Sequence, residues 1–292
     1  MQGNSFLAAV AGLVLALVAA DAHAATINVS PGPNAIQTAV DRADPGDKLL
    51  VKRGTYREAL VVDKRLQIVG NKGKRPVIDG GCDTDRTIDI VANGVGLRHL
   101  TVKGARSGPG DGYTINLIGV ASGRLRDLVL RESCDGSPAY YGVNVFGTGA
   151  LEITGLVTSG GFVDAGIYVG GIGDVGADEF RIERSKSAGN NVGILIEDSV
   201  PEANIMVHDN LTRKNDLPGL SAPAGILVRR SDGGRYSRNQ VRRNGDYGIH
   251  LDADSQRNRL FSNTAGDNGV QDFFDEGSGN CGSQNSFPIG PC

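Results

Sequence analysis

The sequence is poor in the features that mark several large classes of protein. Its 292 residues carry a formal net charge of −3 and contain no tryptophan, two methionines and a single long hydrophobic run. The small negative charge argues against a nucleic acid as the partner, because nucleic-acid-binding proteins present a strongly basic surface. No segment after residue 20 is apolar over the ~20 residues that a membrane-spanning helix needs. Cysteine and histidine show no zinc-type spacing, and no complete calcium loop occurs.

The single hydrophobic run, residues 6–20, lies close to the N-terminus and is followed by Ala22 and Ala24. An uncharged run of this length before small residues is typical of a secretory signal peptide. We therefore expect residues 1–24 to be removed, and the mature protein to be secreted or periplasmic without a membrane span.

The sequence is rich in a short repeated phrase of alternating apolar residues, such as GILIED from Gly193 and GILVRR from Gly225. Apolar side chains at the second and fourth positions of each phrase predict a strand. The copies begin 23–32 residues apart, at Thr87, Thr114, Gly142, Gly166, Gly193, Gly225 and Gly248. Pairs of asparagines spaced by five residues recur between the later copies, and stacked asparagines hydrogen bond through their amides. This period predicts an all-β solenoid of single-stranded parallel coils.

Short segments flank the repeat at both ends. Ile36, Ala39 and Val40 have helical spacing between Asn34 and a Pro-Gly pair, which predicts one amphipathic helix that caps the open end of the solenoid. We divide the mature chain into an N-terminal cap with this helix (25–47), a parallel β-helix (48–276) and a C-terminal disulfide tail (277–292).

Four cysteines in an exported chain predict two disulfides. Cys281 and Cys292 lie close together in the last twelve residues and are expected to pair. Cys82 and Cys134 precede the first and third phrases, so they lie two coils apart, or ~9.6 Å at strand spacing. A bridge between them requires the loop at 133–138 to bend back.

The first part of the β-helix carries a family resemblance. Residues 35–70, with the GTYRE segment Gly54–Glu58, resemble the opening of right-handed parallel β-helix proteins of the pectin-lyase-like superfamily. This superfamily includes pectin methylesterases and nitrous-oxide reductase maturation factors, and the resemblance implies the right-handed fold. The methylesterase segments Gln-Ala-Val-Ala-Leu and Arg-Pro-Trp are absent, as is the Asp-Pro-His-Asp of alginate epimerases. No catalytic residue is therefore carried over from the family.

The repeat itself indicates where chemistry can lie, since equal positions in successive coils stack ~4.8 Å apart. Glu197, Arg229 and Asp252 share the fifth position of the phrase and are expected to form an outward column, with His250 on the same face. We interpret Arg229, His250 and Asp252 as candidate catalytic residues, Glu197 as a substrate ligand, and Glu197 with Asp252 as a candidate Ca²⁺ site. The alternative is a ladder of exposed ion pairs.

Two further sets of outward residues are candidates for substrate binding. Asn144 and Tyr168 belong to a polar column that ends in an aromatic platform, although an ordinary solvated sheet face would look the same. Alignment also stacks Arg213 beneath Arg242 and Lys214 beneath Arg243, within a basic stretch that suits a polyanion. Loops at 104–113, 133–141 and 198–203 can cover these faces.

These observations predict an exported, monomeric β-helix protein that binds an acidic polysaccharide along its outer face, with Ca²⁺ as the one metal to consider. If it is an enzyme, the expected chemistry is that of a lyase or an epimerase. The alternative is a non-catalytic surface or structural module, or a periplasmic accessory protein.

Overall fold

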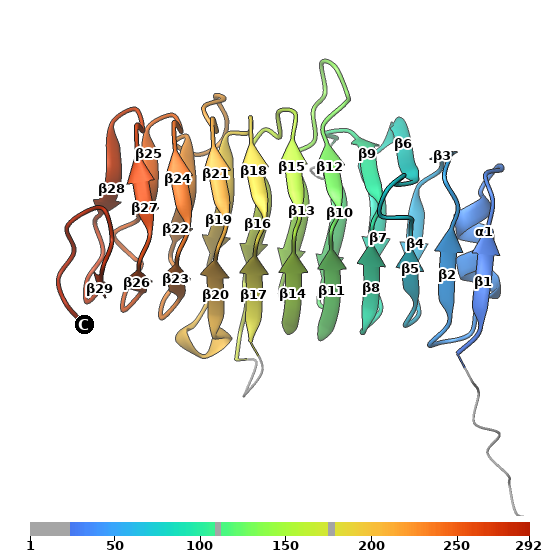
Figure 1. Ribbon diagram of the computed structural model, residues 1–292, viewed down its shortest axis with the longest axis horizontal. Helices are drawn as coiled ribbons and strands as arrows, with labels where there is room; N and C mark the ends of the chain where they lie inside the picture. The colour runs from blue at the N-terminus through green and yellow to red at the C-terminus, as the bar shows by residue number, and fades with distance from the viewer. Residues whose placement is uncertain (1–23, 109–111, 175–178) are drawn as a thin grey trace, which may run out of the picture.

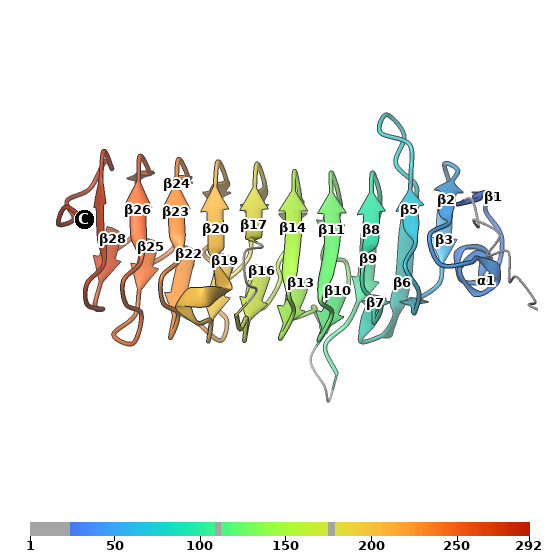
Figure 2. The same cartoon turned by 90° about the horizontal axis from the view of Figure 1, so that it is seen from below.

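The computed structural model describes residues 24–108, 112–174 and 179–292, so the predicted signal peptide lies outside the described residues except for its last position. The coils stack into a rod with helix α1 (Ala35–Arg42) at one end and the C-terminus at the other (Figures 1 and 2). In the described part of the chain, the strands form three parallel sheets of eleven, nine and nine strands. The predicted right-handed parallel β-helix with its N-terminal helix is confirmed.

Each complete coil contributes one strand to each of the three sheets, which we name A, B and C in the order in which the chain visits them. Strands β1 and β29 extend sheet A at its two ends. Sheet A contains β1 (Thr26–Val29), β2 (Lys48–Val51), β5 (Gln67–Val69), β8 (Val95–Arg98), β11 (Ser122–Arg126), β14 (Ala150–Thr154), β17 (Phe180–Glu183), β20 (Ile205–His208), β23 (Arg235–Ser237), β26 (Arg259–Phe261) and β29 (Cys281–Ser283). Sheet B contains β3 (Thr55–Arg57), β6 (Val77–Thr84), β9 (Thr101–Ala105), β12 (Val129–Arg131), β15 (Val157–Ser159), β18 (Lys186–Ala188), β21 (Leu211–Arg213), β24 (Gln240–Arg242) and β27 (Thr264–Gly266). Sheet C contains β4 (Leu60–Val62), β7 (Arg86–Ile90), β10 (Tyr113–Ile118), β13 (Tyr141–Phe146), β16 (Ala165–Gly170), β19 (Val192–Glu197), β22 (Ala224–Arg229), β25 (Tyr247–Leu251) and β28 (Gln271–Asp275).

The apolar positions of the repeated phrase fill the interior of the coils. Ile167, Ile194 and Ile226 are register partners on successive strands of sheet C, and all three are buried in one continuous core. Because alternate residues of a strand point to opposite faces, this register places the third and fifth positions of each phrase on the outside.

Asparagine ladders close the corners between the sheets. Asn239 is fully buried, and its side-chain oxygen accepts hydrogen bonds at 3.1 Å from both nitrogens of Asn210 one coil below. Its amide donates to the Asn263 side chain (3.0 Å) and to the Val207 carbonyl (2.8 Å). A parallel ladder runs through Asn215 and the later asparagines of the next corner. These bonds satisfy backbone groups that the corner would otherwise leave buried without partners.

The GTYRE segment builds the N-terminal cap. The Glu58 carboxylate accepts hydrogen bonds from the backbone N–H groups of Ile36 (3.0 Å) and Gln37 (2.9 Å) at the start of α1. The Tyr56 hydroxyl donates to the Lys52 carbonyl (2.8 Å) within the same coil. A Cβ on Gly54 would lie 2.3 Å from the Pro31 ring, so this close approach requires glycine. The resemblance to the methylesterases at this segment therefore reflects capping and coil closure.

Both predicted disulfides form, Cys82–Cys134 and Cys281–Cys292. The Cα atoms of the first pair are 5.6 Å apart, closer than the two-coil separation expected from the repeat. The register between β6 and β9 shifts between Asp79 and Thr84, and this irregularity carries Cys82 away from its coil position toward the 133–138 loop. Among the described residues, no helix is long and apolar enough to cross a membrane.

Candidate functional site

The outer face of sheet C carries the columns that the sequence predicts. Asn116, Asn144, Tyr168, Leu195 and Leu227 are successive register partners, one to a coil. Beyond Tyr168, where the predicted polar column ends, the next register partner Leu195 is 0% exposed although it occupies an outward position. Tyr168, Leu195 and Leu227 belong to a second apolar cluster, separate from the core.

The segment 214–223, which joins β21 to β22, holds this outer cluster together. The Asn191 side chain donates to the carbonyls of Leu217 (2.7 Å) and Ser221 (3.0 Å) and accepts from the Ser221 backbone (3.2 Å). The Ser221 hydroxyl donates to Asp164 (2.9 Å), which also accepts the Tyr141 hydroxyl (2.8 Å). Segment 214–223 is therefore fixed to this face, and it was not among the three loops expected to cover it.

Glu197 and Arg229 meet as predicted. They are register partners, and the Arg229 Nε lies 2.6 Å from Glu197 Oε1. Arg230 also donates to this carboxylate and reaches Asp198 at 2.6 Å. Burial is the largest single effect and lowers the pKa of Arg229, but the hydrogen bond with Glu197 and the charges of Glu197 and Asp164 together raise it. Burial, together with Glu197, likewise raises the pKa of Tyr168. Both groups are therefore held protonated at neutral pH.

The other two candidate catalytic residues have different partners. Asp252 accepts hydrogen bonds from the Arg230 backbone N–H (3.0 Å) and the Ser255 hydroxyl (2.7 Å). His250 packs beside the stacked rings of Tyr247 and Phe274, and its Nε2 is 2.8 Å from Glu276. Glu197 therefore contacts Arg229, whereas Asp252 and His250 contact other residues. The catalytic roles of Arg229, Asp252 and His250 stay a prediction.

On the earlier coils of sheet C, the outward positions are polar and aromatic but largely buried. The Asn144 amide donates to Asn116 and the Asn116 amide donates to Asp89, each at 2.7 Å. Beside this ladder, the Tyr141 ring stacks on Tyr168 with centroids 4.6 Å apart. Burial, followed by the Asp164 charge, raises the pKa of Tyr141. Asn144 is only 3% exposed, so a substrate could contact it only if the side chains that cover it moved away.

The basic stretch from Arg229 to Arg243 does not form one patch, because fifteen residues run around most of a coil. Arg229 ends a strand of sheet C, Arg235 lies in sheet A and Arg242 in sheet B. The predicted stacking of Arg213 beneath Arg242 is confirmed by their register. Lys214 and Arg243 are the next residues, and the Lys214 N–H donates to the Arg243 carbonyl at 2.8 Å.

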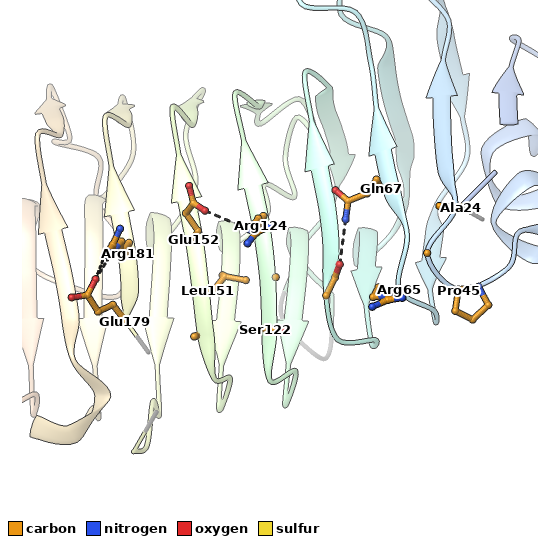
Figure 3. Close-up of a pocket in the computed structure, with 14 residues that line it drawn as sticks. Ala24, Pro45, Arg65, Gln67, Ser122, Arg124, Leu151, Glu152, Glu179 and Arg181 are labelled. Atoms are coloured by element: carbon orange, nitrogen blue, oxygen red, sulfur yellow. Dashed lines mark hydrogen bonds and ion pairs between the residues drawn. The ribbon is translucent and has the colours of Figure 1, made fainter. Parts of the chain in front are cut away.

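A groove that the sequence did not indicate lies on the outer face of sheet A. It has a volume of about 960 Å³ and extends across successive coils from the loop at Pro45 to β17. Small residues form its floor, and longer polar side chains stand along it (Figure 3). The polar side chains are Arg65, Gln67, Arg124, Glu152, Glu179 and Arg181.

The strands of sheet A turn a basic surface outward along this groove and beyond it. Among the described strands, the outward columns hold seven basic and two acidic residues: Lys48, Arg98, Arg124, Arg126, Arg181, Arg235 and Arg259 against Glu152 and Glu183. Arg126 is bonded to Glu152 at 2.6 Å, whereas Arg124 is 3.6 Å from the same carboxylate with 68% of its side chain exposed. The Arg124 guanidinium therefore remains accessible to a ligand in the groove.

The groove lies on the strands that follow the Gly-Ile phrase, whose residues are 28–29 positions apart and carry no recurring phrase of their own. Gly96, Arg124, Glu152 and Arg181 become neighbours only when the register of β8, β11, β14 and β17 is known. Extending the repeat alignment from the Gly-Ile phrase to the strand that follows it would have found the column.

The fold and groove define a right-handed parallel β-helix with a ligand-sized surface along its axis. Residues 100–288 match the family model of the periplasmic copper-binding protein NosD, and the chain belongs to this family. The family is described as periplasmic, and the two disulfides are consistent with an oxidising compartment outside the cytoplasm. No curated protein matches the chain.

Solved structures with the same fold include three proteins of low sequence identity. The alginate lyase AlyGC of family PL6 has a TM-score of 0.61 at 16% identity, and the match covers 89% of this chain and 39% of that one. XylC in complex with xylose has a TM-score of 0.57 at 9% identity (89% and 67% covered). The pectate lyase Pel9A has a TM-score of 0.51 at 12% identity (90% and 78% covered). The chain thus spans less than half the length of AlyGC, and these similarities establish the fold alone.

The copper of the family description is not matched by ligands in the described residues. Copper(I) is held by thiolate, thioether and imidazole groups. In the described part of the chain every cysteine is in a disulfide, and no three His, Cys, Asp or Glu side chains are grouped as metal ligands. His208, for example, lies between the carboxylates of Glu183 (3.2 Å) and Asp209 (2.8 Å). Glu197, proposed for Ca²⁺, faces two guanidinium groups instead.

Proposed function

We propose that the protein binds an anionic polysaccharide, of the polyuronate type, in extended form along the groove of sheet A. The observation that carries the proposal is the groove itself, which follows the solenoid axis over neighbouring coils and has accessible arginines on its walls. A long shallow site along the axis suits an extended polymer better than a compact metabolite, which is bound in an enclosing pocket.

The arginine spacing supports a ligand with regularly repeated charges. Arg124 and Arg181 flank Glu152 in one column, so their Cα atoms are two coils, or ~9.6 Å, apart. A guanidinium group binds a carboxylate through two parallel hydrogen bonds, which fixes both its position and its orientation. Glu152, which lies between these arginines in the column, offers acceptors for sugar hydroxyl groups.

The proposal concerns binding and not turnover. The groove holds arginines, glutamates and a glutamine but no histidine or tyrosine in its lining, and its two glutamates are engaged by arginines. The Glu152 hydrogen bonds with Arg126 help to lower the pKa of that carboxyl, against the opposing effect of its partial burial. A lowered pKa makes a carboxylate a weaker general base.

The test is the affinity of the mature protein for defined polyuronate oligomers from alginate and pectate, measured by calorimetry with and without Ca²⁺. We expect Arg124→Gln combined with Arg181→Gln to weaken binding at least about tenfold, because two charge-assisted contacts are lost. The control Arg57→Gln removes an exposed cation from sheet B and should leave the affinity within about twofold. Equal affinities of the groove variant and the unaltered protein would contradict the proposal.

The same samples decide whether a reaction accompanies binding. Absorbance of unsaturated ends reports a lyase, and counting of reducing ends reports hydrolysis. We expect neither signal to rise. Turnover that disappears in Arg229→Ala and His250→Ala but persists in the groove variant would move the site to sheet C, as the sequence repeat suggested.

A further inference from the structure

A second cationic site lies at the corner between sheets B and C, away from the groove of sheet A. Arg213 and Arg242 stack outward on β21 and β24, and Lys214 and Arg243 follow them in the chain. Together with Leu211 these four side chains line a pocket of about 220 Å³. Four cations on two adjacent coils therefore surround one small volume that no acidic side chain lines.

The lack of balancing charge distinguishes this corner from its neighbours. At the preceding corner Arg238 is bonded to Asp209 at 2.8 Å, and at the following one Arg257 is bonded to Asp232 at 2.9 Å. In the pocket, Arg242 donates to the neutral Gln240 side chain, and the nearest carboxylate to Arg243 is Asp267 at 3.7 Å. The side chains of that last pair are 66% and 74% exposed, so the contact is loose. Like charges at coil spacing repel each other and attract an anion.

Two of these cations lie on residues with a left-handed backbone conformation. Lys214 and Arg243 have positive φ values of 53° and 55°, a conformation that costs a side-chain-bearing residue on the order of 1 kcal/mol. The coil below has Gly189 at the same corner position, also with positive φ. At these turns the side chains of Lys214 and Arg243 lie beside Arg213 and Arg242, the outward arginines of the preceding strands.

The extent of the cluster defines the class of ligand. Along the outward column of sheet B, the register partner below Arg213 is Ala188, and the partner above Arg242 is Gly266. The positive charge at this corner is thus two coils wide and suits a compact group rather than a polymer. The volume corresponds to several water molecules at ~30 Å³ each, enough for a tetrahedral oxyanion with its hydration. Guanidinium forks match the oxygens of such groups in pairs.

We propose that Arg213, Lys214, Arg242 and Arg243 form a binding site for a tetrahedral oxyanion, phosphate or sulfate, either free or as the terminal group of an ester. The proposal is independent of polyuronate binding, since the two sites lie on different sheets and share no residue.

Calorimetric titration of the mature protein with inorganic phosphate, inorganic sulfate and glucose 6-phosphate tests it, with sodium chloride at matched ionic strength as the baseline. We expect saturable heat with phosphate or sulfate, and an affinity at least about tenfold weaker in Arg242→Gln. Arg242→Lys keeps the positive charge but lacks the guanidinium fork. Its affinity for the anion should lie between those of the unaltered protein and Arg242→Gln. Saturable heat with glucose 6-phosphate alone would assign the site to an esterified group.

The matched control is Arg131→Gln, which removes an exposed cation from the same outward column three coils away. Its affinity should equal that of the unaltered protein. Equal losses in Arg131→Gln and Arg242→Gln would show an adventitious ion only, held by general surface charge, and would overturn the proposal. Heats of titration with phosphate and sulfate that match the sodium chloride baseline would also overturn the proposal. Unchanged melting temperatures of the variants confirm that each is folded.

Discussion

At the scale of single residues, the sequence predicted which side chains point into the core and which point outward. It did not predict which of the outward side chains are covered. The alternation in Gly-Ile-x-Ile phrases placed Ile194 and Ile226 in the core, and the five-residue asparagine spacing predicted the ladders through Asn210 and Asn239. The same alternation placed Leu195 outward without showing that segment 214–223 is fixed over this face. An apolar residue at an outward position was the available signal, because such a residue implies a cover.

Replacing one asparagine tests how much a ladder stabilises the fold. Asn239→Ala leaves the buried nitrogens of Asn210 and the Val207 carbonyl without their partner. We expect the free energy of unfolding to fall by at least about 2 kcal/mol, because buried polar groups lose their hydrogen bonds. Urea denaturation measures the loss, and Gln240→Ala, an exposed neighbour, should change stability by less than about 0.5 kcal/mol. Equal effects of the two changes would refute a stabilising ladder.

The turn residue Asp209 gives a pH dependence. Its hydrogen bonds with Arg238 hold the pKa of Asp209 well below its usual value, against an opposing desolvation. A lowered pKa in the folded state stabilises the fold above the unfolded value near 3.9, and this contribution is lost as the pH falls from about 4 toward the folded pKa. We expect Asp209→Asn to remove this part of the acid destabilisation.

The effect of Asp209→Asn at pH 7 should stay under about 1 kcal/mol, because the pair is exposed. Unfolding curves between pH 7 and pH 2 provide the measurement. If the difference in free energy of unfolding between the two proteins stays the same across that range, the ionisation of Asp209 contributes nothing to the pH dependence of stability.

At the scale of elements, the strands, the capping helix and the Cys281–Cys292 disulfide followed from local pattern, whereas the Cys82–Cys134 geometry and the groove did not. Strand β11 and strand β17 contribute Arg124 and Arg181 to one column, although 57 positions separate them in the chain. Coil lengths vary with the inserted loops, so a register error of one residue would turn each side chain to the other face. The GTYRE segment shows the converse case, because its family likeness is explained by the hydrogen bonds of Tyr56 and Glu58.

The capping role of Glu58 has a local consequence. Glu58→Ala removes the acceptor for two N–H groups at the start of α1, which should lower the stability of the helix by about 1–2 kcal/mol. Hydrogen exchange of the helix amides measures this directly, with exchange faster by about tenfold or more. The neighbouring exposed change Arg57→Ala serves as control. Helix protection that survives Glu58→Ala unchanged would assign the cap to apolar packing of Ile36 and Val40 alone.

At the scale of the whole molecule, the net charge conceals an uneven distribution. The chain is slightly negative overall, yet the outward columns of sheet A are predominantly basic, and many acidic side chains lie at corners, such as Asp198, Asp209 and Asp232. A β-helix of the NosD family can therefore present a cationic surface along its axis without a basic composition. The composition alone shows that the molecule as a whole is not strongly charged. It does not show where on the surface the charges of one sign gather.

A crystal structure of residues 25–292 with a bound polyuronate oligomer tests the central claim most directly. We expect sugar density along β8, β11, β14 and β17, with ligand carboxylates paired to Arg124 and Arg181, two of the residues drawn in Figure 3. Density on the outer face of sheet C instead, against Tyr168 and Arg229, would contradict it.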